Sequence, residues 1–236
     1  MQTREWAIGP LCALALLACT PGPAAAEEAK AAYPAMAPLT QYRIASRAEE
    51  ITLARSAAPA SISGDAEVLT LGDRDYETAV KGNNGFVCLV ERSWAAGFGD
   101  AEFWNPRLRA PICFNAAAVH SVLPAYLERT KWVIAGASKS DMLGRTKAAL
   151  AANTFTMPEA GAMCYMLSKD GYLSDADGHW HPHLMFFMAR TDSAAWGANL
   201  SGSPIFAAQG DPEPVTTFMV PVIKWSDGTP AVMEKH

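Results

Sequence analysis

The alternation of hydrophobic and polar positions in the first half of the chain predicts several short strands. Residues 67–71 and 86–92 are rich in β-branched and other apolar side chains, and residues 76–81 alternate between polar and apolar. The run Gly-Asn-Asn-Gly at 82–85 accepts the positive φ angles of a type I′ turn. The pattern therefore predicts a hairpin in which 86–92 pairs antiparallel with 76–81.

Helical periodicity and capping residues predict three helices. The run Ser-Arg-Ala-Glu that begins at Ser46 is a capping box, and it predicts a helix over 47–57. Asn115 can cap a second helix, in which Pro124 introduces a kink. A third helix is expected over about 141–152, after a serine that can cap it.

Three further strands are predicted at 162–168, 183–189 and 216–225. Residues 184–188 are apolar on both faces, which is typical of a buried central strand. Strands on both sides of a helical block, without repeated alternation of strand and helix, indicate an α+β fold. We expect one domain over residues 40–236, with a mainly antiparallel sheet of about five to six strands and about three helices.

The N-terminal segment has the layout of a secretory signal peptide. A short apolar run at 11–18 follows Arg4, and it is too short to span a bilayer, which needs about 20 apolar residues. A signal peptide of residues 1–26 ends at an Ala-x-Ala site, whereas the run Leu-Leu-Ala-Cys ending at Cys19 resembles the lipobox of bacterial lipoproteins. Residues 27–39 are expected to form a flexible tether. We therefore expect an exported bacterial protein that is periplasmic or anchored to the envelope.

The net charge limits the partners. The chain carries 19 basic and 24 acidic residues, a formal charge of −5 at pH 7. A mildly acidic surface disfavours binding to the phosphate backbone of nucleic acids. We expect a small-molecule ligand, no nucleic acid, and contact with a membrane only through an N-terminal lipid anchor.

Three cysteines lie in the predicted domain, namely Cys88, Cys113 and Cys164. In an oxidising compartment an odd number suggests one disulfide and one free thiol. Cys88 lies on a predicted strand and Cys113 follows the loop that leaves this strand, so we expect these two to be linked. Closing that loop would stabilise the fold by about 3.5 kcal/mol in the chain-entropy account. Cys164 is then expected to be a small buried core residue.

The densest group of chemically active side chains is His179, His181 and His183, three of the five histidines. Residues two apart in an extended chain share a face and advance about 6.5 to 7 Å, so an adjacent pair could hold one metal ion. Three could do so only if the backbone bends, and Pro182 favours a bend or a sheet edge. We expect His181 and His183 to be the more important pair, as ligands of a divalent metal ion or as proton donors.

Tryptophan side chains supply a second candidate feature. Trp94 and Trp104 lie in a long segment between a strand and a helix, and such segments often carry function. Their rings could stack on a flat ligand, or they could fill one end of the core. The expected ligand pocket comprises His179, Trp180, His181, His183, Trp94 and Trp104.

Cys113 permits an alternative chemistry. A thiol near a helix N-terminus can be acidified, and His181 or His183 on a later strand could act as its base. This order of cysteine, helix and histidine resembles papain-like cell-wall peptidases, and the resemblance implies a thiol hydrolase. It is a resemblance of order alone, because the run Ala-Pro-Ile-Cys-Phe-Asn at 110–115 carries no signature of that family.

Four short runs together resemble a set of uncharacterised exported bacterial proteins. They are Lys-Gly-Asn-Asn-Gly-Phe-Val-Cys at 81–88, Ala-Pro-Ile-Cys at 110–113, Met-Cys-Tyr-Met-Leu at 163–167 and His-Pro-His-Leu-Met at 181–185. That set has no assigned activity, so the resemblance implies no catalytic residues. The expected function is a non-catalytic envelope protein that binds a small ligand or a metal ion. The alternatives are a metal-dependent enzyme that uses His181 and His183, and the Cys113-histidine thiol hydrolase.

The lipobox reading predicts how the chain is processed. Expressed in a bacterial host, the protein should fractionate with membranes, and Cys19→Ser should release it, because the substitution removes the thiol that receives the lipid. Membrane fractionation and mass spectrometry of the mature N-terminus measure this. An unmodified mature chain that begins at Glu27 would contradict the lipid anchor and leave the ordinary signal peptide.

Overall fold

The computed structural model describes residues 33–175, 178 and 180–231, all of which belong to one compact unit, Ala31–His236. The predicted signal peptide, Cys19, residues 27–32 of the predicted tether and His179 lie outside the described residues. Among the residues that are described, no helix combines the length and the apolar character that a membrane span requires.

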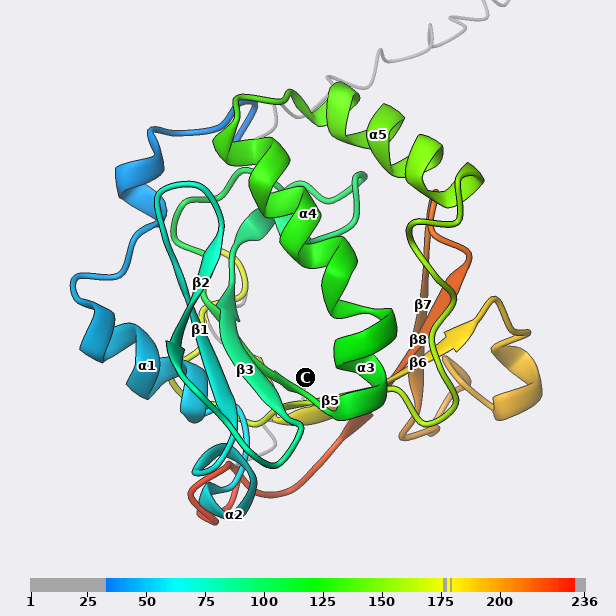
Figure 1. Cartoon of the computed structure of the whole chain (residues 1–236). Helices are drawn as coiled ribbons and strands as arrows, with labels where there is room; N and C mark the ends of the chain where they lie inside the picture. The colour runs from blue at the N-terminus through cyan, green and yellow to red at the C-terminus, as the bar shows by residue number, and fades with distance from the viewer. Residues whose placement is uncertain (1–32, 176–177, 179, 232–236) are drawn as a thin grey trace, which may run out of the picture. The chain divides into compact units, whose positions relative to one another are not determined.

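One eight-stranded sheet forms the centre of this unit (Figure 1). The strand order is β2-β1-β3-β4-β5-β6-β8-β7, and all neighbouring pairs are antiparallel except β1 and β3. The fold is therefore α+β, as the sequence predicts. The strands are β1 (Glu67–Leu71), β2 (Tyr76–Val80), β3 (Val87–Glu91), β4 (Ala110–Phe114), β5 (Met163–Met166), β6 (His183–Ala189), β7 (Phe206–Gly210) and β8 (Val215–Pro221).

The predicted hairpin at 82–85 is wrong. β3 lies beside β1 and runs parallel to it, with Glu67 opposite Val87, and it does not pair with β2. The tight turn instead joins β1 to β2, where the Gly72 amide donates to the Asp75 carbonyl at 2.8 Å. Burial explains the difference. β2 has exposed residues and lies at the sheet edge, whereas all five residues of β3 are buried and require neighbours on both sides.

The segment 81–86 crosses the end of β1 instead of turning back. A Cβ atom at Gly82 would lie 2.0 Å from the Glu67 nitrogen, so this close crossing requires glycine. Two residues later, the Asn84 side chain accepts a hydrogen bond from the Phe86 amide at 3.0 Å. The glycine and asparagine residues that indicate a hairpin turn therefore lie in a connection that crosses from β2, past the end of β1, to β3.

The sheet contains two strands that the sequence analysis does not predict, β4 and β7. Pro111 argues against β4, because proline lacks the amide donor of an interior strand. The Pro111 nitrogen points to the same side of β4 as the Arg109 amide, because the two residues are two positions apart. The Arg109 amide donates to the Tyr172 carbonyl at 2.9 Å. On that side β5 pairs only with Cys113 and Phe114, so no β5 carbonyl lies opposite Pro111 and its missing amide proton breaks no hydrogen bond of the sheet. β7 is an edge strand with mostly exposed or half-buried residues and carries little apolar signal.

The three longest helices, α1, α4 and α5, agree with the expected number of about three. Ser46 caps the first, because its hydroxyl accepts the Glu49 amide at 3.1 Å, and Asn115 caps the next helical block through the Ala118 amide at 3.0 Å. Pro124 stands at the start of a new helix, so this block is divided instead of kinked. The helices are α1 (Arg47–Arg55), α2 (Ala60–Ser63), α3 (Ala116–Ser121), α4 (Leu123–Ile134) and α5 (Lys139–Ala151), with 3₁₀ turns η1 (Leu39–Tyr42), η2 (Ser93–Ala95) and η3 (Ala194–Trp196).

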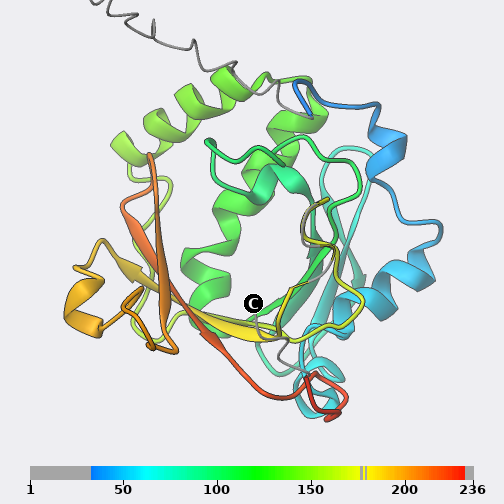
Figure 2. The same cartoon turned by 180° about the vertical axis from the view of Figure 1, so that it is seen from behind.

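The sheet curves around α3 and α4 (Figures 1 and 2). We call the face toward these helices the inner face; it carries the larger core, which includes Leu89 and Phe114. The opposite, outer face is packed by α1, whose Ala54 contacts a smaller core with Val90. Phe186, on the outer face of β6, is 38% exposed, so the prediction that both faces of 184–188 are buried is wrong. The reason is that α1 packs on β1, β2, β3 and β4 and does not extend to β6.

Cys88 and Cys113 form a disulfide. They lie directly opposite each other on β3 and β4, with their Cα atoms 4.0 Å apart, and both belong to the small core under α1. Cys164 is a free, fully buried cysteine in the core of the inner face. Both predictions about the cysteines are confirmed.

A buried ion pair connects α1 to the end of β3. Arg92 Nη2 donates to Glu50 Oε1 at 2.8 Å, and the two side chains are 0% and 6% exposed. The same carboxylate oxygen accepts the Leu71 amide at 3.1 Å, and Arg92 Nε donates to the Tyr42 carbonyl at 2.7 Å. The pair therefore joins four segments, and removing either charge would leave the other buried without compensation.

We predict that Glu50→Gln destabilises the domain by about 3 to 5 kcal/mol, because it keeps the side-chain volume but leaves the Arg92 charge unpaired. Urea unfolding of the oxidised protein measures the change. Glu49→Gln is the matched control, since this exposed neighbour undergoes the same charge change and should cost less than about 1 kcal/mol. Equal stability of the two variants would show that the ion pair contributes nothing.

Candidate ligand-binding cavity

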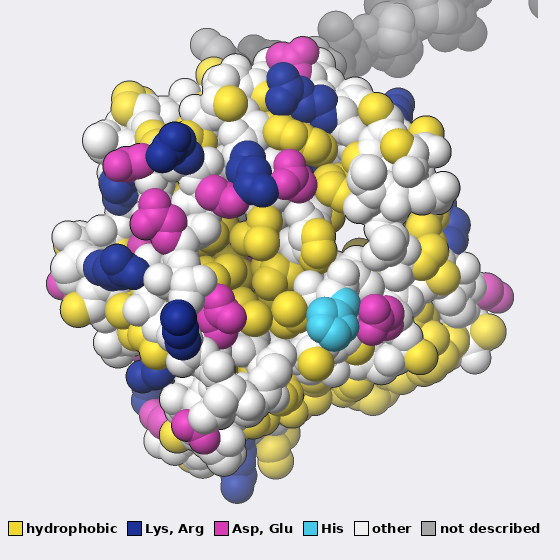
Figure 3. Space-filling model, viewed as in Figure 1, with side chains coloured by type: hydrophobic (Ala, Val, Ile, Leu, Met, Phe, Trp, Pro, Cys, Tyr) yellow, Lys and Arg dark blue, Asp and Glu magenta, His cyan; other side chains and the backbone are white. Residues whose placement is uncertain are grey.

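A cavity of about 310 Å³ lies between the helices and the last three strands on the inner face of the sheet. The space-filling view shows the surface hollowed between α4 and the segment that follows α5 (Figure 3). The lining is mostly apolar, with a few polar side chains. It is formed by Ala95, Gly97, Ser121, Val122, Pro124, Ala125, Tyr126, Arg129, Leu150, Phe155, Thr156, Met157, Pro158, Phe187, Ala208, Gln209, Gly210, Glu213, Pro214, Val215 and Thr217.

Sheet register builds one wall of the cavity. Phe187 of β6 stands opposite Thr217 of β8, and Thr217 stands opposite Ala208 of β7. Paired residues in neighbouring strands point to the same face of a sheet. The three side chains therefore form a row across β6, β8 and β7 that faces α4.

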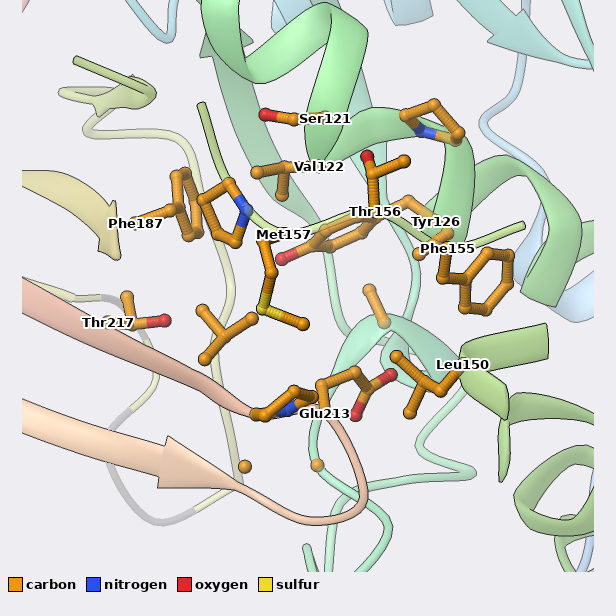
Figure 4. Close-up of a pocket in the computed structure, with 18 of the residues that line it drawn as sticks. Ser121, Val122, Tyr126, Leu150, Phe155, Thr156, Met157, Phe187, Glu213 and Thr217 are labelled. Atoms are coloured by element: carbon orange, nitrogen blue, oxygen red, sulfur yellow. The ribbon is translucent and has the colours of Figure 1, made fainter. Parts of the chain in front are cut away.

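One side of α4 and the residue before it build the opposite wall. Val122, Ala125, Tyr126 and Arg129 follow the spacing i, i+3, i+4 and i+7, which places them on one helical face. Figure 4 shows the Tyr126 hydroxyl directed into the cavity beside Met157. None of the other described residues forms a hydrogen bond with this hydroxyl. Burial raises the pKa of Tyr126 well above its usual value, and the Glu91 carboxyl raises it further, so the phenol is protonated at neutral pH.

The charged groups of the lining are Arg129 and Glu213, and they pair with each other. Arg129 Nη2 donates to Glu213 Oε1, while Nη1 donates to the carbonyls of Ala95 and Ala96 at 3.2 Å each. The guanidinium carbon also lies 4.5 Å from the centre of the Phe98 ring. This ion pair therefore ties α4 to the segment between β7 and β8 at the rim of the cavity.

Glu91, the last residue of β3, lies close to this cluster. Alternation along β3 places it on the inner face with Leu89, and its buried Oε1 has no hydrogen-bond partner among the residues that the structure describes. Burial raises the pKa of Glu91 to about 8, although the charge on Arg129 acts to lower it. Its carboxyl also raises the pKa of Cys164, a smaller effect than the burial of that thiol. Glu91 is therefore mainly an uncharged carboxylic acid at neutral pH.

The histidine segment lies elsewhere. His183 is on the inner face of β6 opposite Met166, and its Nδ1 is 2.7 Å from the His181 carbonyl oxygen. Burial lowers the pKa of His183 below its ordinary value, and the contact with the His181 carbonyl partly opposes this. His181 is exposed, whereas Trp180 is buried and its ring lies nearly perpendicular to the ring of His183, with the ring centres 6.2 Å apart. None of these three residues is part of the cavity lining described above.

The described residues contain no group of three or more His, Cys, Asp or Glu side chains that could hold a metal ion. The predicted pair, His181 and His183, stands on either side of Pro182 where β6 begins, and His179 lies outside the described residues. Binding of a divalent metal ion by this pair stays a prediction.

The two predicted loop tryptophans are core residues. Trp94 is 1% exposed, and its Nε1 donates to the Thr130 hydroxyl at 2.9 Å. Trp104 is also buried, and its carbonyl accepts the Tyr42 hydroxyl at 2.8 Å. Trp104 borders a separate, more open hollow beside Met36, and neither tryptophan lines the cavity next to α4.

The disulfide bears on the thiol alternative. The sulfur of Cys113 is bonded to Cys88, so it is not available as a thiolate nucleophile. Cys113 also lies on the outer face of the sheet, whereas His183 lies on the inner face. This geometry separates the two groups that a thiol hydrolase would need, so it does not support that alternative.

Sequence reasoning does not identify the cavity residues. Tyr126, Arg129 and Glu213 belong to no local motif, because the walls come from separate segments that only the fold brings together. The one local signal is Glu91, an acid at the end of a strand whose other residues are apolar. Such a residue must be paired or neutralised when it is buried.

We predict that Glu91→Gln weakens the pH dependence of stability. Between pH of about 4.5 and about 8 the folded wild-type chain keeps this proton while the unfolded chain releases it, so wild-type stability should fall as pH rises through this window. Glutamine cannot ionise, and the difference should approach a few kcal/mol at most, since a tenfold change in proton affinity corresponds to about 1.4 kcal/mol.

Urea unfolding at several pH values from 5 to 9 measures this difference. Glu77→Gln, an exposed acid on edge strand β2, is the control and should leave the pH profile unchanged. Parallel profiles for wild type and Glu91→Gln would mean that the buried carboxyl is not neutral in the folded state.

Three comparisons, with protein-family models, with curated proteins and with solved structures, found no match for this chain.

Proposed function

We propose that this chain is an exported envelope protein whose folded domain binds a small, mainly apolar molecule in the cavity beside α4. The observation that carries the proposal is the apolar cavity of about 310 Å³ with an unpartnered Tyr126 hydroxyl directed into it. Ligand pockets typically have volumes of about 300 to 1,000 Å³ and combine apolar walls with a few orienting polar groups. The cavity fits the lower end of that range.

The chemistry of the lining supports binding rather than catalysis. The described lining residues include no histidine and no cysteine. The Ser121 hydroxyl donates to the Ala117 carbonyl at 2.7 Å and accepts the Glu159 amide at 2.9 Å, so its proton is directed at a backbone carbonyl and not at a side-chain base. Covalent catalysis needs a nucleophile that a base or a lowered pKa activates. The lining described above offers neither.

The N-terminal pattern and the cysteines support export. A signal-peptide layout precedes the domain, and a disulfide between Cys88 and Cys113 is typical of proteins in oxidising compartments. In this proposal the cavity faces the periplasm or the outside of the envelope, and the ligand is a small molecule of that compartment. The membrane is contacted only through a lipid on Cys19, if the lipobox is used.

We predict that purified protein binds N-phenyl-1-naphthylamine, an uncharged probe whose fluorescence rises in apolar surroundings. Titration should give a saturable signal, because the cavity removes the probe from water. Ala208→Phe should weaken binding by about tenfold or more, since the added ring occupies space on the cavity wall.

The matched control is Ala207→Phe, the same substitution on the next residue of β7. Ala207 stands opposite Phe218 on the outer face and does not line the cavity, so binding should stay within about twofold of wild type. Thermal melts confirm that both variants are folded. Absence of saturable binding to wild type, or equal loss in both variants, would overturn the proposed function.

A further inference from the structure

The described residues of the cavity lining offer a ligand no free charge. Its lining contains one basic and one acidic side chain, Arg129 and Glu213, and these are bonded to each other. The Nη1 group donates to two backbone carbonyls, and Nε, which has no hydrogen-bond partner among the described residues, is buried away from solvent. An anion would therefore enter without a counter-ion, and a cation would have to compete with Arg129 for Glu213.

An unpaired charge is costly in such surroundings. Transferring a charged group from water into an apolar site without a partner is unfavourable by far more than one hydrogen bond returns. The apolar residues that dominate the walls, among them Phe155, Met157 and Phe187, cannot supply that partner. The walls therefore discriminate against ligands of either charge.

Polar selection must then come from uncharged groups. Figure 4 shows the hydroxyls of Tyr126 on α4 and Thr217 on β8 on opposite walls. Thr156, which Figure 4 also labels, is exposed to solvent. The Gln209 amide is committed to the Thr191 carbonyl at 3.0 Å, and Ser121 is committed as described above. The Tyr126 hydroxyl is directed into the cavity, and burial raises its pKa well above the usual value, so it keeps its proton. It can therefore donate a hydrogen bond to an acceptor atom of a bound ligand.

We propose that the cavity selects uncharged, mainly apolar molecules that present one hydrogen-bond acceptor, such as a carbonyl oxygen, to the hydroxyl of Tyr126. This proposal rests on the proposed function and adds the chemical class of the ligand. It assigns Arg129 and Glu213 to the structure of the rim, where they exclude charged molecules.

Charge selection is tested with two probes that share one aromatic skeleton. N-phenyl-1-naphthylamine is uncharged, and 8-anilinonaphthalene-1-sulfonate carries one added sulfonate. The signal from the cavity is defined as the part that Ala208→Phe removes and Ala207→Phe keeps. We expect the uncharged probe to bind there at least about tenfold more tightly than the sulfonate.

The outcomes separate the two proposals. If neither probe gives a signal that depends on Ala208, the proposed function fails, and the ligand class fails with it. If the sulfonate binds in the cavity as tightly as the uncharged probe, the proposed function stands and the charge selection is overturned.

The role of Tyr126 is tested by competition with two molecules of nearly equal shape, 2-acetylnaphthalene and 2-isopropenylnaphthalene. In the wild type the ketone should displace the uncharged probe at about three- to tenfold lower concentration than the alkene, the range expected for one hydrogen bond. Tyr126→Phe should remove this preference. Thr217→Val deletes the opposite hydroxyl while keeping the side-chain shape, and should leave the preference intact.

The test with Tyr126→Phe remains informative if this variant is less stable. The preference is the ratio of the ketone and alkene concentrations that displace the probe, and both concentrations are measured on the same folded variant. Circular dichroism and saturable probe binding establish that the variant is folded. A preference for the ketone that persists in Tyr126→Phe, or that disappears in Thr217→Val instead, would overturn the assignment of the donor.

Discussion

The ion pair between Glu50 and Arg92 fixes the end of β3, where the buried Glu91 lies within the electrostatic influence of Arg129 in the cavity lining. It holds α1 against the outer face at the end of β3, with hydrogen bonds to the η1 segment and to β1. Because successive side chains of a strand point to opposite faces, fixing Arg92 outward directs Glu91 inward. The end of β3 therefore places the paired charge of Arg92 on the outer face of the sheet and the carboxyl of Glu91 on the inner face. Glu91 Oε1 has no hydrogen-bond partner among the described residues.

The protein treats its buried charges in two ways. Arg92 and Arg129 are each paired with a carboxylate and donate to backbone carbonyls, so both charges are compensated. Glu91 Oε1 has no such partner in the described part of the chain, and burial keeps the carboxyl mainly protonated at neutral pH by raising its pKa to about 8. Both arrangements leave little net charge near the cavity. The apolar walls and the Tyr126 hydroxyl then decide which molecules fit, which is the basis of the ligand class proposed above.

Local signals in the sequence predicted local structure well. Ser46 and Asn115 were identifiable as helix caps because the capped amide lies three residues away, and the structure contains both bonds. The apolar run at 183–189 has the predicted strand bounds. The run Gly-Asn-Asn-Gly at 82–85 led to a wrong prediction, because a local signal can fit two different structures. Glycine serves both a tight turn and a close crossing, and only the neighbour Glu67 distinguishes them.

By itself the sequence determined the α+β class, the helix starts and the pairing of Cys88 with Cys113, because each depends on spacing along the chain. Tertiary structure alone decided that β3 pairs with β1 and that Pro111 lies within a strand, because both follow from which segments are buried side by side. The cavity belongs to this second group. Its walls come from α4 and from strands about 60 to 90 residues later in the chain, and no local pattern records a contact that forms only when the sheet curves around the helix.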